Sequence, residues 1–372
     1  MSWSPQQSAA LQAIEDWHEA HGEQVFYLAG FAGTGKTTLA KHIAAGVSGQ
    51  VMFGAFTGKA ALVLRQKGCD GASTLHSMLY KPREVREKGP NGAWVTRVTF
   101  DLNSLADVAL ASLVIVDECS MVDERLGRDL LSFGTKVLVL GDPAQLPPVR
   151  GEGFFTAGAP DFMLTEIHRQ AAENPIIRMS MDVREGRRLR RGAYGDSAVI
   201  GQRDLPDDER RRSNQILCGM NRSRRTLNAM VRTECGFDPD RPEVGDRLVC
   251  LRNNHQKGLL NGGLWKVDEV LGFDDDGVRL MVQSLDDPDR DPIRVYVRRE
   301  FFHGEEDKLE YNERRNTDEF TYGYALTVHK SQGSQWDRVL VYDESFAFRE
   351  NRSRHLYTAL TRAANAVTVV QH

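Results

Sequence analysis

The chain has 372 residues, 41% of them hydrophobic, which is long enough for two or three domains with apolar cores. Its formal net charge is −4, so a nucleic-acid site would have to be a local channel rather than a broadly basic surface. It contains no run of 18 apolar residues and no charged and apolar leader, which predicts a cytoplasmic protein with no membrane partner. The five cysteines are scattered without a C-x-x-C pair, so we expect reduced thiols.

The chain opens with Ser4-Pro5-Gln6-Gln7, in which Ser4 can cap a short amphipathic helix with Pro5 at its first position. Residues 25–29 are apolar and predict a buried parallel strand, and apolar residues at helical spacing over 37–45 predict a second helix. Residues 30–38 lie between them and match the pattern G-x-x-x-x-G-K-T in full. The sequence therefore places a glycine-rich loop at a helix N-terminus.

Such a loop presents free backbone N–H groups to an anion, and its glycines let the backbone curl around phosphates. Lys36 would reach the β and γ oxygens of a nucleotide, and Thr37 would hold Mg²⁺ through its hydroxyl. The alternative is a Gly-rich turn that carries a solvated lysine. The pattern predicts a nucleotide and Mg²⁺ as cofactors.

The strand, loop and helix pattern repeats over residues 51–56, Thr57-Gly58-Lys59 and residues 60–66. After Ser73-Thr74-Leu75-His76, residues 80–103 interrupt it with a polar stretch that turns at Gly89-Pro90-Asn91-Gly92. This stretch predicts an inserted β-hairpin with Trp94 beside its turn. Trp94 could instead pack the hairpin onto the domain.

The parallel pattern resumes at residues 113–116, an apolar strand that ends in Asp117-Glu118. Carboxylates at the carboxyl end of such a strand lie where ligands bind, so Asp117 would hold Mg²⁺ through water and Glu118 would orient or deprotonate the attacking water. A helix-capping acidic pair is the alternative. A further strand over 136–140 leads to Gln145, a candidate sensor of the γ-phosphate.

In the second half, residues 174–184 predict a helix followed by five arginines, which we interpret as a solvated helix end: Arg184, Arg187, Arg188, Arg190 and Arg191. Residues 215–219 predict a strand, and a helix follows to residue 232. From 238 onward, short alternating runs broken by turn residues predict a small antiparallel barrel. Residues 320–327 are expected to return to the second large sheet, and residues 366–370 to form its last strand.

Eight segments in this order resemble the helicase motifs of superfamily 1, and specifically its RecD-like and bacteriophage Dda-like branch. They read G-F-A-G-T-G-K-T-T, F-T-G-K-A-A, S-T-L-H-S, V-D-E-C-S-M, G-D-P-A-Q-L-P-P-V, L-T-E-I-H-R-Q, L-T-V-H-K-S-Q-G-S-Q-W-D and L-Y-T-A-L-T-R-A. The resemblance extends from Gln7 to Ala363, nearly the whole chain.

The resemblance implies an α/β protein with two RecA-like P-loop domains, whose parallel sheets have flanking helices. The first would span residues 1–150 and carry a β-hairpin pin at about 80–103. The second would combine residues 151–237 and 320–372, and an SH3-like β-barrel would be inserted at 238–319.

The resemblance also assigns site residues. The catalytic ones are Lys36, Glu118, Gln145, Arg169 and Arg362, and Asp117 and Thr37 hold the metal. ATP would bind to Gln7, which reads adenine, and to Gly33, Thr34, Gly35, Lys36, Thr37, Thr38 and Gly333. The DNA-contacting positions are Thr57, Lys59, Thr74, His76, Trp94, Thr327 and His329. The two lone histidines could instead be packed, hydrogen-bonded side chains. His168 stands where related helicases often have an aromatic residue against adenine.

The function implied is an ATP-dependent DNA helicase and translocase that moves 5′ to 3′ on single-stranded DNA. Its partners would be single-stranded DNA, single/double-strand junctions, and replication or recombination proteins, in a bacterial or phage-infected cell. One alternative is a motor subunit of a recombination nuclease complex. Another is a P-loop kinase or GTPase acting on a small molecule, which would not need Arg169 and Arg362.

Overall fold

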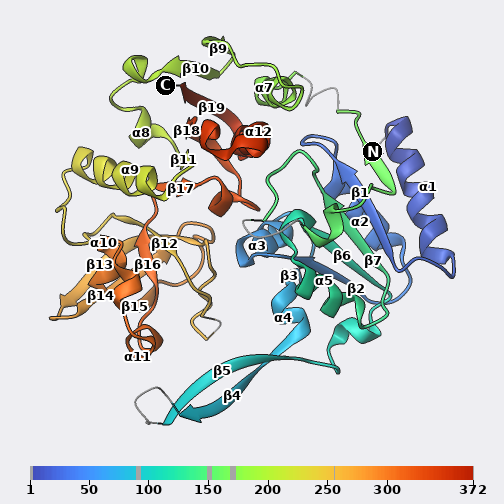
Figure 1. Ribbon diagram of the computed structural model, residues 1–372, viewed down its shortest axis with the longest axis horizontal. Helices are drawn as coiled ribbons and strands as arrows, with labels where there is room; N and C mark the ends of the chain where they lie inside the picture. Colours follow the sequence, from blue (N-terminus) through green and yellow to red (C-terminus); the bar gives the residue numbers. More distant parts are fainter. Residues whose placement is uncertain (1–2, 89–93, 149–152, 168–172, 255, 372) are drawn as a thin grey trace. The chain divides into compact units, whose positions relative to one another are not determined.

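The computed structural model describes residues 3–88, 94–148, 153–167, 173–254 and 256–371 (Figure 1). The chain divides into two compact units. Unit 1 comprises Met1–Phe56, Ala60–Pro143 and Pro147–His168, and unit 2 comprises Thr57–Lys59, Ala144–Leu146 and Arg169–His372. All five cysteines are free thiols. Among the described residues, no helix is both long and apolar enough to span a bilayer.

Unit 1 is built on a six-stranded parallel sheet with strand order β3-β2-β6-β7-β1-β8. Its strands are β1 (Val25–Gly30), β2 (Val51–Ala55), β3 (Ser73–Thr74), β6 (Leu113–Asp117), β7 (Val137–Gly141) and β8 (Phe162–Leu164). Its helices are α1 (Pro5–Glu19), α2 (Lys36–Gly46), α3 (Gly58–Gln66), α4 (Leu75–Leu79) and α5 (Glu124–Leu131).

Both faces of this sheet are covered, because alternate residues of each strand point to opposite sides. Leu113 and Ile115 of β6 belong to the apolar cluster that includes residues of α1 and α2. Val114 and Val116 belong to a second cluster with residues of α4 and α5. The continuous apolar run in the sequence therefore reflects burial on both sides.

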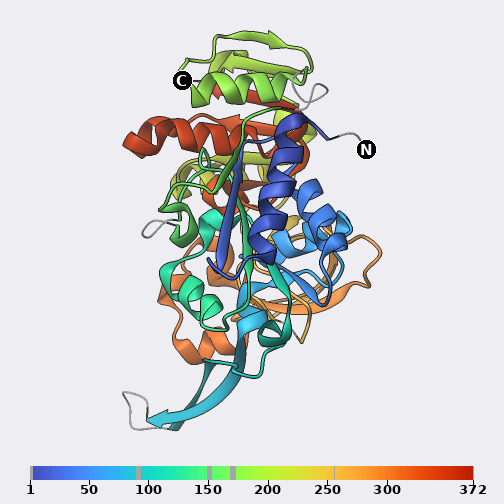
Figure 2. The same cartoon turned by 90° about the vertical axis from the view of Figure 1, so that its right-hand side faces the viewer.

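Residues 80–103 contain an antiparallel hairpin of β4 (Tyr80–Lys88) and β5 (Trp94–Leu102), which extends away from α4 (Figure 2). Its predicted turn lies outside the described residues. At the base, Tyr80 Oη donates a hydrogen bond to Asp129 Oδ2 at 2.5 Å. Burial and this bond raise the pKa of Tyr80 to about 12. The His76 ring lies 4.6 Å from Phe100 and 4.7 Å from Tyr80. These contacts fix the base of the hairpin to unit 1.

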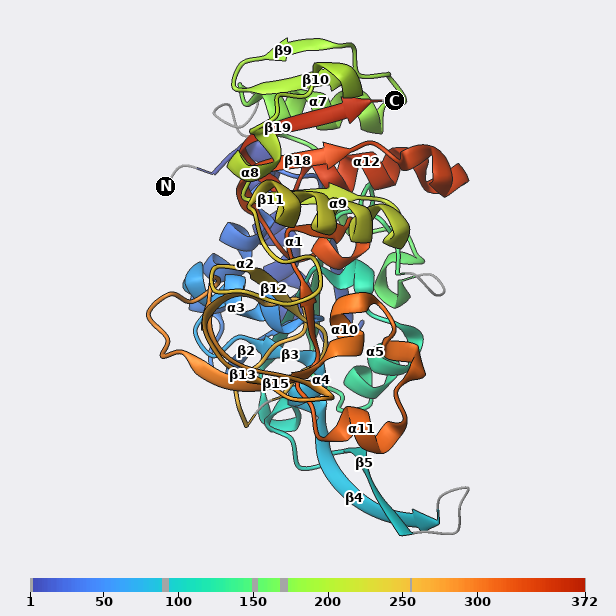
Figure 3. The same ribbon diagram turned by 90° about the vertical axis from the view of Figure 1, so that its left-hand side faces the viewer.

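Unit 2 contains a six-stranded sheet in the order β17-β11-β18-β19-β10-β9, parallel except for the β9–β10 pair. Leu340 and Tyr342 of β18 pack with Leu227 and Val231 of α9, whereas α7 and α12 pack against each other and the sheet's other face (Figures 1 and 3). The strands are β9 (Gly192–Tyr194), β10 (Ser197–Gly201), β11 (Gln215–Cys218), β17 (Ala325–Thr327), β18 (Trp336–Tyr342) and β19 (Ala363–Gln371). The helices are α7 (Pro175–Arg184), α8 (Glu209–Arg212), α9 (Asn221–Glu234) and α12 (Arg352–Leu360).

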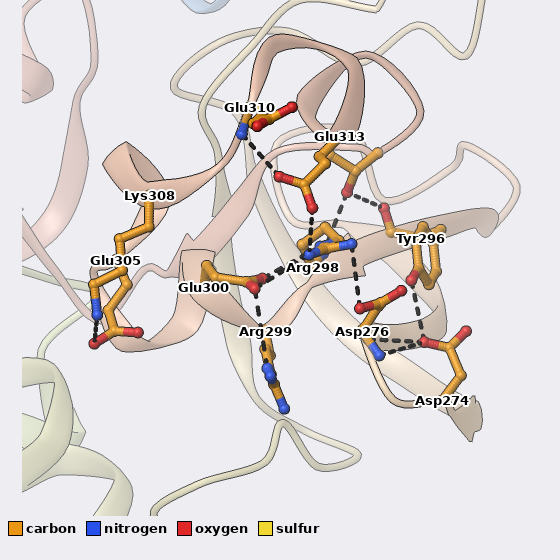
Figure 4. Close-up of polar contacts among 12 residues, drawn as sticks. Asp274, Asp276, Tyr296, Arg298, Arg299, Glu300, Glu305, Lys308, Glu310 and Glu313 are labelled. Carbon is orange, nitrogen blue, oxygen red and sulfur yellow. Dashed lines mark hydrogen bonds and ion pairs between the residues drawn. The ribbon is translucent and has the colours of Figure 1, made fainter.

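A five-stranded antiparallel sheet in the order β15-β14-β13-β12-β16 also belongs to unit 2. It consists of β12 (Arg247–Cys250), β13 (Leu264–Phe273), β14 (Gly277–Ser284), β15 (Ile293–Arg298) and β16 (Phe320–Tyr322), with α10 (Arg299–His303) and α11 (Tyr311–Arg315). Arg298 Nη2 lies 3.0 Å from Glu313 Oε1 and 3.3 Å from Glu300 Oε1 (Figure 4). Arg298 therefore joins β15 to both short helices.

Two boundaries differ from our expectations. We expected residues 320–327 to return to the second large sheet, but Phe320–Tyr322 pairs with β12 in the small sheet, and only β17 joins the large one. We also expected the first domain to end at residue 150, whereas β8 pairs with β1 in the sheet of unit 1. Both errors arose because a strand of three residues carries no signal of its pairing partner. Strands β9 and β10 were not predicted.

Candidate functional site

The glycine-rich loop follows β1 and leads into the N-terminus of α2. Gly33 and Gly35 both have φ of 82°, in the left-handed region that favours glycine, and Gly35 caps the helix. At Gly30, an added Cβ would come within 2.7 Å of Thr34 Oγ1. Three of the motif glycines are therefore required by backbone conformation or by space. The first N–H groups of α2, which include those of Thr37 and Thr38, have no partner within the helix and can bind an anion.

The Lys36 side chain turns back over this loop. Its Nζ donates hydrogen bonds to Gly30 O at 2.6 Å and Phe31 O at 3.2 Å. Thr34 is buried, and its Oγ1 also donates to Phe31 O, at 2.8 Å. The ammonium group is thus held against the backbone of the loop. When a phosphate binds, Lys36 would give up these hydrogen bonds to carbonyls for stronger, charge-assisted ones to the phosphate.

Thr37, in the first turn of α2, and Asp117, the last residue of β6, come together. Thr37 Oγ1 donates to Asp117 Oδ2 at 3.3 Å, and Asp117 Oδ1 accepts from Glu118 N at 2.9 Å. Burial, followed by the charge of Glu118, raises the pKa of Asp117. A hydroxyl and a carboxylate are hard oxygen donors of the kind that Mg²⁺ prefers when it keeps several waters. Among the described residues, no group of three or more His, Cys, Asp or Glu could hold a metal ion.

Glu118 has a backbone conformation that side chains rarely adopt, with φ of 52° and ψ of 45°. A non-glycine residue in this region costs on the order of 1–3 kcal/mol and is found most often at functional sites. No pattern in the sequence indicates this backbone conformation. The conformation turns the chain sharply after β6, at the carboxyl edge of the sheet.

Cys119 lies just after Glu118 and has no exposed surface. Burial raises the pKa of its thiol, followed by the charges of Asp117 and Glu118. A Cβ added at Gly141 would come within 2.7 Å of Cys119 Sγ, so the packing here is tight. The thiol is structural rather than reactive.

Gln7 connects α1 to the loop. It forms the predicted helix cap with Ser4, whose Oγ accepts from Gln7 N, and Gln7 Oε1 accepts from Ser4 N at 3.1 Å. Its Nε2 donates to Thr34 O at 3.1 Å. Gln7 therefore lies against the phosphate loop within unit 1, and its contact with adenine remains a prediction.

Three of the predicted nucleotide residues that the structure describes group with unit 2. Arg362 is buried and donates to Thr358 O and Ser334 O, each at 3.2 Å. Gly333 has φ of 73°. Gln145 is also buried, and its Oε1 accepts no hydrogen bond within the described part of the chain. Arg169 and its neighbour His168 lie outside the described residues.

The predicted DNA-contacting residues differ in exposure. Thr74 is buried and caps α4 by accepting from Ser77 N at 3.1 Å, whereas His76 is exposed and Trp94 is 68% exposed. Thr57 is half-buried at the start of α3. Lys59 groups with unit 2, where its Nζ lies 3.1 Å from Asp286 Oδ1, and burial lowers its pKa.

Thr327 is the last residue of β17 and His329 lies just after this strand, and both are half-buried. Two residues that the sequence did not suggest lie beside His329: its ring centroid is 5.6 Å from Phe348 and 6.4 Å from His355. Phe348 and His355 stack at 4.0 Å. Burial lowers the pKa of His329 and brings that of His355 to about 3. No single local pattern indicates this cluster, because His329 follows β17 whereas Phe348 and His355 lie in the later stretch around the start of α12.

Two family models match the chain. Residues 2–204 match the model described as an AAA domain, which is more than half of the chain, and residues 322–370 match the UvrD-like helicase C-terminal domain. An ATP-dependent RecD2 DNA helicase from Deinococcus radiodurans is 32% identical over 375 residues, 92% of this chain and 46% of that protein.

The ATP-dependent DNA helicase dda of Enterobacteria phage T4 is 30% identical over 261 residues, 60% of this chain and 55% of that protein. The chain thus spans about half the length of these curated relatives. A crystal structure of Bacteroides Pif1 bound to ssDNA shares the fold, with a TM-score of 0.57 at 19% identity over 99% of this chain and 92% of that one. The chain belongs to the superfamily 1 helicases, in their RecD-like and Dda-like branch.

Proposed function

We propose that this protein is an ATP-dependent motor that moves 5′ to 3′ along single-stranded DNA and unwinds duplex or displaces bound proteins. The observation that carries the proposal is the hydrogen bond between Thr37 and Asp117. It joins a complete phosphate loop to the acidic pair at the end of β6. The relatives described as ATP-dependent DNA helicases support the same activity.

For the nucleotide, Lys36 would bind the β and γ oxygens, and the N–H groups at the start of α2 would bind phosphate. Mg²⁺ would be held by Thr37 and, through water, by Asp117; when bound, it would neutralise charge on the phosphates. Glu118 would position and deprotonate the attacking water. The hydrogen bond between the Thr37 hydroxyl and the Asp117 carboxylate supports these roles, because it brings the two groups that would hold Mg²⁺ together.

Arg169 and Arg362 would stabilise the charge that gathers on the γ-phosphate, an effect worth roughly 10³ to 10⁵ in rate where an arginine has this role. Gln145 and the Gly333 N–H would respond to the same phosphate. The buried guanidinium of Arg362 supports this role, because burial strengthens its interaction with an anion.

Single-stranded DNA, including that at single/double-strand junctions, would contact Thr57, Lys59, Thr74, His76, Thr327 and His329. The exposed ring of Trp94 supports a role for the hairpin as the pin that parts the strands. We further propose that the small antiparallel sheet is an SH3-like barrel inserted in the second RecA-like domain. Strands β11 and β17 pair with each other in the large sheet, and the small sheet lies between them in the sequence. This order supports an insertion.

The proposal is tested by strand displacement with ATP on two matched duplexes, one with a 5′ and the other with a 3′ single-stranded tail. We expect displacement of the 5′-tailed substrate and DNA-stimulated ATP hydrolysis. Preference for the 3′ tail would overturn the polarity. ATP hydrolysis indifferent to single-stranded DNA would overturn the motor itself.

A further inference from the structure

A groove of about 450 Å³ in unit 2 has no role in the function proposed above. It is formed by the end of α7 and the loop after it, the residues that follow β18, the start of α12 and the end of β19. We call it the arginine groove, after Arg187, Arg188 and Arg352, which line it. Its volume falls within the range of small-ligand sites. It includes part of the arginine run after α7 that we interpreted as a solvated helix end.

A tight turn presents these arginines. Helix α7 ends at Arg184, Gly186 adopts φ of 77°, and Arg187 N donates to Asp182 O at 2.8 Å. This is a glycine-terminated helix end in which the chain reverses direction at once. Leu189, just beyond, is buried, and its carbonyl accepts from Gln371 Nε2 at 3.3 Å. Arg187 and Arg188 are therefore fixed at the rim from both sides.

Of the three arginines that line the groove, Arg187 is neutralised by carboxylates. Arg187 pairs with Asp182 and Glu185. Arg188 and Arg352 are exposed, and neither forms an ion pair within the described part of unit 2. The groove thus offers two guanidinium groups to an anion, and its lining also includes Asp343, whose Oδ1 accepts from Ser345 N at 3.1 Å.

The segment between β18 and α12, residues 345–351, connects this groove to the predicted DNA residues. Its Phe348 faces His329 and His355, whereas its Phe346 lines the groove and is 55% exposed. Within this segment, Arg349 adopts φ of 42° and ψ of −110°, a strained conformation for a side-chain-bearing residue. Such strain persists where the surrounding structure fixes it and is concentrated at ligand clamps.

We propose that the arginine groove binds single-stranded nucleic acid, with a base stacked on Phe346 and flanking phosphates on Arg188 and Arg352. An aromatic ring among cations is the combination that binds single strands without sequence preference. The inference rests on the proposed function. It adds a second contact with DNA at Phe346, whereas Phe348 of the same segment lies beside His329.

The aliphatic floor argues against an acidic peptide as the occupant. Val183, Leu189 and Leu356 are each less than a tenth exposed, so they leave no open apolar pocket. Peptide recognition at a groove usually requires a pocket that receives an anchoring side chain. A planar ring and two guanidinium groups suit a base and two phosphates better.

The test is equilibrium binding of fluorescent oligothymidylate between about 4 and about 16 nucleotides, the span of common single-strand sites. Phe346→Ala should weaken binding of the longer strands about fivefold or more, with Phe346→Trp near wild type. The double variant Arg188→Ala/Arg352→Ala should reduce the slope of log K against log salt by about 1.4, because two phosphate contacts are lost. The shortest strands should bind all variants alike.

The matched control is Arg211→Ala/Arg294→Ala, which removes two exposed arginines of unit 2 that do not line the groove. Wild-type affinity and salt slope in the groove variants would overturn the inference and leave the motor proposal intact. If the wild-type protein binds no single-stranded DNA, the motor proposal itself fails. Loss of binding to a fluorescent aspartate- and phenylalanine-rich peptide, with DNA binding unchanged, would instead make the groove a peptide site.

Discussion

Thr37 Oγ1 donates a hydrogen bond to Asp117 Oδ2 at 3.3 Å, although 80 residues separate them in sequence. The contact crosses the carboxyl edge of the sheet from the loop after β1 to the end of β6. It brings a hydroxyl and a carboxylate to one point beside a phosphate-binding helix N-terminus, which is the arrangement that a metal-nucleotide complex requires.

We expect Asp117→Asn to lower the rate of Mg²⁺-dependent ATP hydrolysis roughly a hundredfold or more, because an amide cannot supply the negative charge that attracts Mg²⁺. Thr37→Ser keeps the hydroxyl and is the conservative control, which should retain most activity. Steady-state hydrolysis over a range of Mg²⁺ concentrations measures both. Full activity of Asp117→Asn at ordinary Mg²⁺ would remove Asp117 from the site.

Lys36→Ala should remove ATP hydrolysis and leave DNA binding largely in place, since the Lys36 ammonium group donates its hydrogen bonds to two carbonyls of the phosphate loop in unit 1. Its folding cost should be small, because the two carbonyls it leaves can bind water instead. ATPase assays and oligonucleotide binding in parallel decide the outcome. Comparable turnover in the variant would contradict the nucleotide assignment.

Arg362→Ala should depress kcat strongly while the KM for ATP changes by a modest factor, because the guanidinium acts on charge that develops in the transition state. Arg362 also holds Thr358 O and Ser334 O, so a structural contribution must be separated. Arg362→Lys keeps the charge but loses the planar fork, and it should recover little activity. A rise in KM alone would mark a ground-state binding residue.

His355 predicts an acid sensitivity of the fold. Its pKa is about 3 because burial disfavours the charged ring, and His329 adds to the effect. Below about pH 6.5 the unfolded chain binds a proton that the folded chain refuses, so stability falls as pH falls, by about 1.4 kcal/mol per unit until about pH 3. His355→Phe keeps a ring beside Phe348 without a titrating group. Its unfolding free energy should drop about 2 kcal/mol less than wild type between pH 6.5 and 5. Equal losses would assign the acid sensitivity to other groups.

Local signals predicted the strand and the helix around the glycine-rich loop well, because both are coded by neighbouring residues. A glycine-rich loop must lie between its strand and helix, so β1 and α2 were found to within about a residue. Pairing between distant segments was not coded in this way. Nothing near Phe320–Tyr322 indicates that β12, some 70 residues earlier, is its partner rather than β11. The left-handed conformation of Glu118 and the Phe348–His355 stack were also missed, because neither the φ of one residue nor a contact between two rings leaves a pattern in the sequence.

The last prediction concerns the hairpin. We weighed two roles for Trp94, one as the residue that parts base pairs and one as an anchor that packs the hairpin onto the domain. Trp94 is 68% exposed, and its ring contact is with Lys88 of the same hairpin. The anchoring contacts are made instead at the base, by Tyr80 with Asp129 and by Phe100 with His76. Exposure therefore favours the strand-separating role.

Trp94→Ala should slow duplex unwinding several-fold, because a stacked base contact is worth about 1–3 kcal/mol. DNA-stimulated ATP hydrolysis, translocation on single strands and melting temperature should stay near wild type, since little packing is lost. Leu105→Ala, at a residue 87% exposed beyond the hairpin, controls for removal of exposed apolar surface and should unwind normally. Joint loss of unwinding, ATP hydrolysis and thermal stability in Trp94→Ala would make Trp94 structural and place the separating element elsewhere.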